Sequence, residues 1–116
     1  MIVIADIELD SADERPDVGS PVIVEVRDTT AADGDSVTLA TTTARVEGRA
    51  SSWVVTAELE VDDAAIPSGA DLTVWARIAT TSTPHTSRGD WITMESVPVP
   101  AHSGEQRVTV PVRHFA

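Results

Sequence analysis

Alternation of apolar and polar residues with a period of two is the dominant pattern in this chain of 116 residues. In the first run, Val3–Asp10, apolar residues alternate with acidic ones. Such alternation is typical of a β-strand that buries one face and exposes the other, because successive side chains point to opposite faces of a sheet. The positions of this run that we expect to point inward are Val3, Ala5, Ile7 and Leu9.

Six further segments show strand patterns, and turn signals such as Asp33-Gly34-Asp35 and Pro67-Ser68-Gly69 separate them. Helix is expected only as one winding near Asp63–Ile66. The chain therefore predicts a single all-β domain over residues 1–116, an antiparallel two-sheet β-sandwich of about seven strands. The residues predicted to be buried between the sheets are Val22, Val24, Val26, Trp53, Val55, Leu59, Val61, Leu72, Val74, Ile78, Val108 and Val110.

Two of these strand segments need separate treatment, one for its buried face and one for its place in the sheet. In the segment 91–97 the pattern leaves the inward face open, because Ile92 and Met94 compete with Trp91 and Thr93 for it. The last strand contains Pro111, which has no backbone N–H to give to an interior ladder. We expect that strand to lie at a sheet edge.

Charge and composition exclude several classes of function. The formal net charge is −11, and all eight basic residues are arginine. Nucleic acid is excluded as a partner, since its binding draws on clustered cations. Cysteine is absent, which removes disulfides and thiolate chemistry. No run of apolar residues reaches the roughly 18 residues of a membrane span, and no export signal or lipid anchor is seen, so we expect a cytoplasmic protein that is a monomer or weak homodimer.

No motif for catalysis or metal binding stands out. The chain has neither a Gly-x-Ser-x-Gly elbow nor a glycine-rich phosphate loop. Asp28, Asp33 and Asp35 resemble part of a calcium loop, but the distal glutamate that completes an EF-hand is missing. Three scattered histidines do not have metal-ligand spacing; they are His85, His102 and His114. We expect no catalytic residues, no metal and no cofactor, with a small enzyme of dispersed acidic residues as an alternative.

Tryptophan provides the candidate binding surface. Trp75 alternates out of phase with the apolar residues around it and therefore shares the outward face of its strand with Thr73 and Arg77. An outward Trp beside an Arg is common in protein-contact surfaces and in sugar-stacking surfaces. The predicted partner-binding surface comprises Trp75, Arg77 and Trp91. Either a protein partner or, alternatively, a carbohydrate stacked on the indoles would fit it.

Three segments in order resemble the YbaY/YscW family of small lipoprotein domains. They are the strand and loop Val22–Asp33, the segment Leu59–Pro67 that ends in Ile-Pro, and the strand Leu72–Ile78 with the letters LTVWARI. The resemblance implies a compact β-sandwich without catalysis. The YscW branch comprises pilotins of type III secretion, lipoproteins that help an outer-membrane secretin reach or assemble in its membrane. This chain departs from it in having no lipobox cysteine and no signal peptide, which puts secretin escort in doubt. The function expected is a non-catalytic interaction or assembly domain.

Overall fold

The computed structural model describes residues 1–9, 14–30, 36–47, 53–80, 86, 88–95, 97–100 and 104–115, and for residues 53 and 54 only the backbone. Over these residues the chain forms eight strands and one turn of 3-10 helix, η1. The all-β prediction is confirmed. The strands are β1 (Ile2–Leu9), β2 (Pro21–Asp28), β3 (Val37–Arg45), β4 (Trp53–Glu60), β5 (Leu72–Ile78), β6 (Trp91–Ile92), β7 (Val97–Val99) and β8 (Glu105–His114), with η1 (Asp63–Ala65) between β4 and β5.

The strands bury the faces that their alternation predicts. In β1 the four apolar positions of the pattern are fully buried, and β2 alternates in the same way. β5 alternates from Leu72 to Ala76, after which the outward Arg77 is buried as well. The core is one cluster of aliphatic side chains, to which every strand except β3 and β6 contributes. Trp91 of β6 completes this cluster. Val108 is half-buried rather than buried, and the side chain of Trp53 lies outside the described residues. The other ten residues predicted as core are buried.

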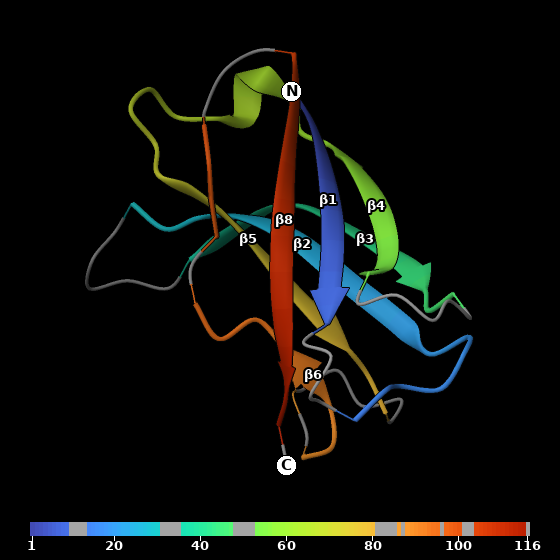
Figure 1. Ribbon diagram of the computed structural model, residues 1–116. Coiled ribbons are helices and arrows are strands. Elements are labelled where there is room, and N and C mark those ends of the chain that lie inside the picture. The colour runs from blue at the N-terminus through green and yellow to red at the C-terminus, as the bar shows by residue number, and fades with distance from the viewer. Residues whose placement is uncertain are drawn as a thin grey trace.

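The strands follow the order β3-β2-β5-β6-β8-β1-β4 in a continuous sheet, and β7 pairs with β5 beside this path. Figure 1 shows β4, β1 and β8 crossing in front of β5, β2 and β3, so that the sheet folds over its own core. The two layers are not separate sheets, because β6 pairs with β5 on one side and with β8 on the other. The prediction of a two-sheet sandwich is therefore not confirmed in that detail.

One pairing in the sheet runs parallel. The first and last strands, β1 and β8, lie side by side in the same direction over the whole length of β1 (Figure 1). The other ladders between described strands are antiparallel. The expectation of an antiparallel sheet is thus wrong for this pair. Side-chain alternation marks the faces of a strand and carries no information on the direction of its neighbour.

The last strand, β8, lies between β6 and β1 in the sheet order, so the expectation that it lies at a sheet edge is wrong. Its proline is nevertheless accommodated. Ile2 donates its N–H to the carbonyl of Gly104, which directs the backbone of the even-numbered residues of β8 toward β1. The backbone of Pro111 then faces the other side, where β8 pairs with β6 over only two residues, Arg113 and His114. A missing N–H at Pro111 therefore costs no ladder hydrogen bond.

The connection between β4 and β5 contains the helical turn and the glycine turn that the sequence predicts. Asp62 accepts a hydrogen bond from the N–H of Ala64 at 3.0 Å and caps η1. Gly69 has a φ of +73°, and the N–H of Ala70 donates to the carbonyl of Pro67 at 3.1 Å. Glycine suits that position because other residues rarely adopt a positive φ. In the part of the chain that is described, no helix is long and apolar enough to cross a membrane.

Candidate functional site

Trp75 projects from the outer face of β5, away from the core, as the alternation of its strand predicts. Leu72, Val74 and Ala76 are buried, whereas Trp75 and Thr73 are half-buried. Glu25 of β2 lies directly opposite Trp75 in the ladder. An indole in this position presents apolar area at the surface of the sheet, and no conformational change is needed to expose it.

The guanidinium of Arg27 lies over the indole. Its Cζ atom is 4.4 Å from the ring centroid of Trp75, which is the geometry of a cation–π contact. Glu25 holds Arg27 in this position, because one carboxylate oxygen accepts hydrogen bonds from Nε at 2.8 Å and from a terminal guanidinium nitrogen. One side of the indole is therefore covered by a cation whose charge is already compensated.

A pocket opens where the sheet beside β5 is interrupted. On this side β5 pairs with β7 over Leu72–Val74 and with β6 over Arg77–Ile78, and the chain between β6 and β7 departs from the ladder. Thr93 completes the edge, since its hydroxyl accepts from the N–H of Ala76 at 2.9 Å. The hollow that remains has a volume of about 230 Å³.

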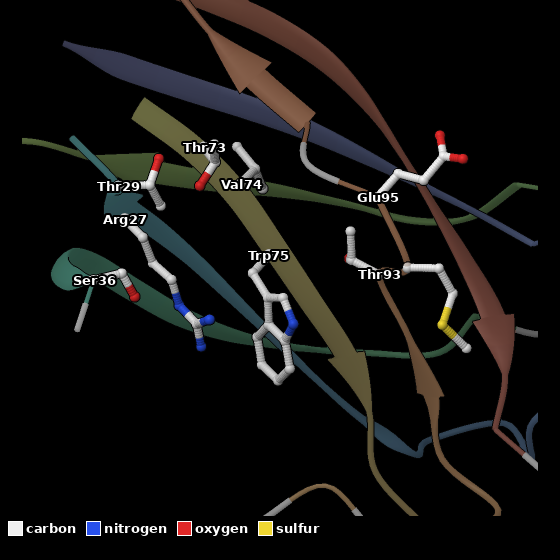
Figure 2. Close-up of a pocket in the computed structure, with 9 residues that line it drawn as sticks. Arg27, Thr29, Ser36, Thr73, Val74, Trp75, Thr93 and Glu95 are labelled. Carbon is white, nitrogen blue, oxygen red and sulfur yellow. The ribbon is translucent and has the colours of Figure 1, made fainter. Parts of the chain in front are cut away.

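The pocket has an apolar floor and a polar rim. Figure 2 shows the indole of Trp75 between Arg27 and Thr93, with Glu95 farther along the rim. Met94 is 54% exposed and is therefore more accessible than the half-buried Trp75. The lining residues are Arg27, Thr29, Ser36, Thr73, Val74, Trp75, Thr93, Met94 and Glu95.

Arg77 does not share the exposed surface that the sequence predicts for it. It lies on the outward face of β5, but only 5% of it is exposed, so this part of the prediction is wrong. Its Nε is 3.7 Å from Oδ2 of the fully buried Asp90. The other carboxylate oxygen of Asp90 accepts from the N–H and the hydroxyl of Thr80, both at 2.8 Å. An acidic residue thirteen positions later in the sequence, just before β6, thus pairs with the arginine.

Trp91 also lies in the core, and this settles the face that the sequence left open. Its backbone pairs with Ile78 of the core face, and it is 5% exposed. The indole N–H donates to the carbonyl of Glu14 at 2.7 Å, and the ring stacks on His114 with centroids 4.6 Å apart. Burying a Trp with its N–H satisfied is the usual arrangement in a core. Of the three residues predicted as a surface, the structure leaves Trp75 accessible, and its binding role stays a prediction.

The residues that complete the pocket were not predicted as site residues. Arg27 stands on an outward position of its strand, which the sequence does reveal, but nothing in the sequence pairs β2 with β5. Met94 and Glu95 lie in a segment whose strand pattern is ambiguous. The signal that could have found them is the Met at an outward position next to an acidic residue, between two short apolar runs.

The charged groups considered as metal ligands do not gather among the described residues. Within those ranges no three His, Asp or Glu side chains lie close enough to hold an ion. Asp28 forms a capping hydrogen bond instead: it accepts from the N–H of Thr30 at 3.0 Å and from the Thr30 hydroxyl. These bonds lower the pKa of the Asp28 carboxyl. Four other members of the two candidate sets, Asp33, Asp35, His85 and His102, lie outside the described residues, and His114 stacks on Trp91.

Comparison with known proteins gives a likeness of fold. No protein-family model and no curated protein matches the sequence. Among solved structures, the chain is similar to an alternative pilotin from the type II secretion system of Vibrio cholerae, with a TM-score of 0.70 and 19% sequence identity. The alignment covers 98% of this chain and 97% of that chain. The pilotin-like fold expected from the resemblance to the YbaY/YscW family is confirmed.

Proposed function

We propose that this chain with a pilotin-like fold is a non-catalytic interaction or assembly domain, which binds a protein partner at the pocket around Trp75. The observation that carries the proposal is a preformed apolar surface on the outside of the sheet. Trp75 is only half-buried, Met94 is 54% exposed, and Arg27 is already locked in place by Glu25. Aromatic residues, Met and Arg are the side chains enriched at protein interfaces.

The side chains of Arg27 and Trp75 are fixed before binding, which favours binding at this pocket over binding at other exposed apolar residues. Ordering a flexible side chain on binding costs free energy, and a side chain that is fixed before binding avoids that cost. Arg27 and Trp75 are held by each other and by the β2–β5 ladder. The other exposed apolar residues on the described part of the chain do not line this hollow; they are Ile2, Val18, Val37 and Phe115.

Carbohydrate binding is the second candidate, and the half-buried indole is the observation that favours it. A sugar ring stacks on an open aromatic face. At Trp75 one face is taken by Arg27, so a sugar could approach from the Thr93 side alone. Trp91, the other indole once predicted for such a platform, is buried. The pocket therefore fits a protein partner better than a glycan.

Site-specific photo-crosslinking in cells tests the proposal. A photoreactive phenylalanine analogue placed at Met94 should form a covalent adduct with one protein, identified by mass spectrometry, and Trp75→Ala should abolish that adduct. The matched control carries the analogue at Val18, which is 70% exposed and does not line the pocket. Equal adducts from both positions, or an adduct at Met94 that Trp75→Ala leaves unchanged, would contradict the proposal.

A glycan array separates the two candidates. Retention of a glycan that is lost on Trp75→Ala, with no protein adduct at Met94, would favour the carbohydrate-binding alternative. We further propose that the domain acts as a monomer or weak homodimer, which light scattering across a range of concentrations can test.

A further inference from the structure

We infer that the partner segment bound at the Trp75 pocket is cationic, with one apolar side chain that enters the pocket between basic residues. This inference rests on the proposed function and specifies the chemistry of the partner. It follows from the shape of the pocket, from the charges on its rim and from the charge of the whole chain.

The pocket admits a single apolar anchor. Its volume of about 230 Å³ is set between Arg27 on one side and the Thr93–Glu95 segment on the other, and Trp75 and Met94 supply its exposed apolar side chains. Figure 2 shows that these two sides stand on either flank of the indole. A space of this size accepts one aliphatic side chain and leaves the residues next to it in the partner at the rim.

The rim carries uncompensated negative charge. Among the described residues that line the pocket, Arg27 is the one basic residue, and Glu25 neutralises it. Glu95 is exposed and forms no ion pair with any described residue. Asp28 and Asp71 adjoin the rim through Thr29, whose N–H donates to the carbonyl of Asp71 at 2.9 Å.

The negative charge of Asp28 and the net charge of the whole molecule both favour a cationic partner. Hydrogen bonds from Thr30 lower the pKa of Asp28 and keep it ionised. The chain has a formal net charge of −11, which repels acidic segments and attracts basic ones. Complementary charge of this kind sets the choice of partner and the rate of encounter more than the affinity itself.

Three synthetic peptides of one length test the inference by NMR titration of the ¹⁵N-labelled protein. The probe has a central leucine flanked by lysines in a glycine background. The first comparison peptide replaces the lysines with aspartates, and the second replaces the leucine with serine. We expect the lysine–leucine peptide to shift the Trp75 indole resonance and the amides of Met94 and Glu95, and the other two to bind at least about fivefold more weakly.

Protein variants show whether residues of the pocket itself recognise the positive charge of the peptide. Glu95→Gln should weaken the lysine–leucine peptide about two- to fivefold, the range of one exposed ion pair. Met94→Ser should weaken it as well, and both residues are exposed, so neither variant should perturb the fold. Glu58→Gln is the matched control, because Glu58 is an exposed glutamate on β4 that does not line the pocket.

The outcomes separate this inference from the function on which it rests. Equal or tighter binding of the aspartate peptide, shifts outside the pocket, or binding by none of the three peptides would overturn the cationic partner. If the adduct at Met94 persists in that case, the interaction function stands and only the chemistry of the partner is wrong. If the adduct is absent too, both fail, and a neutral glycan that shifts the Trp75 indole would assign the pocket to carbohydrate.

Discussion

Asp90→Ala should lower the free energy of unfolding by about 3–5 kcal/mol, the usual cost of removing one partner from a buried ion pair. Arg77 and Asp90 are both buried, and Arg77 Nε lies 3.7 Å from Asp90 Oδ2. Two unit charges at this separation attract each other by about 4.5 kcal/mol at an effective dielectric constant of about 20. Much of this attraction only offsets the cost of taking both charges out of water. Without Asp90 that cost remains for Arg77 and the compensation is lost.

Asp90→Asn separates the charge from the hydrogen bonds. The amide oxygen of asparagine can still accept from the N–H and hydroxyl of Thr80, which lie 2.8 Å from Asp90 Oδ1. The difference between the Asn and Ala variants therefore reports the hydrogen bonds, at about 1–3 kcal/mol. The difference between the Asn variant and the native protein reports the charge.

The double variant Arg77→Met, Asp90→Ala should be less destabilised than the two single changes added together. Removing both charges removes both desolvation costs, and methionine fills much of the space of the arginine stem. We expect a coupling energy of about 1–3 kcal/mol from the cycle of four proteins.

Urea denaturation followed by circular dichroism measures all four free energies, provided that the slopes with denaturant agree. Arg107→Ala is the matched control. Arg107 forms an ion pair with Asp6 at 2.8 Å, but it is largely exposed, and this change should leave the unfolding free energy nearly unaltered. If Asp90→Ala cost no more than Arg107→Ala, the reasoning about a buried ion pair would be wrong.

Three further predictions follow from the same structure. Val74→Asp places a charge in the core and should cost several kcal/mol, whereas Thr73→Asp on the outer face should cost little; urea unfolding of both variants compares them, and equal costs would mean that the faces of β5 are misassigned. The lowered pKa of Asp28 means that this carboxylate stabilises the fold above its pKa in the unfolded chain, and that the stabilisation is lost as the pH falls through its pKa in the folded protein. In Thr30→Val, an NMR titration of the Asp28 carboxyl should show a higher pKa, because the hydrogen bond from the Thr30 hydroxyl is removed. An unchanged pKa would contradict the assignment of the shift to Thr30. The fluorescence of Trp75, measured with the other two tryptophans replaced, should be partly quenched by acrylamide, and a blue, unquenched emission would place this indole in the core.

The faces of the strands can be read from the sequence because they depend on local geometry. Side chains of a strand alternate whatever its neighbours are, so the buried positions of β1, β2 and β5 follow from hydrophobicity alone. The same holds for the turn at Gly69 and the helical turn at Asp63, which are formed by residues next to one another. The outward direction of Trp75 was predictable for this reason.

Which strands are neighbours was decided by the tertiary structure. The parallel contact of β1 with β8 joins the two ends of the chain, and no residue pattern within either strand specifies its direction. The site depends on such contacts: Arg27 reaches Trp75 because β2 pairs with β5, and the pocket exists because the chain leaves the ladder between β6 and β7. Arg77 was expected on the surface, but Asp90 buries it from another part of the chain. Whether an outward residue is exposed depends on which other parts of the chain fold over it. The alternation within its own strand carries no information about those parts.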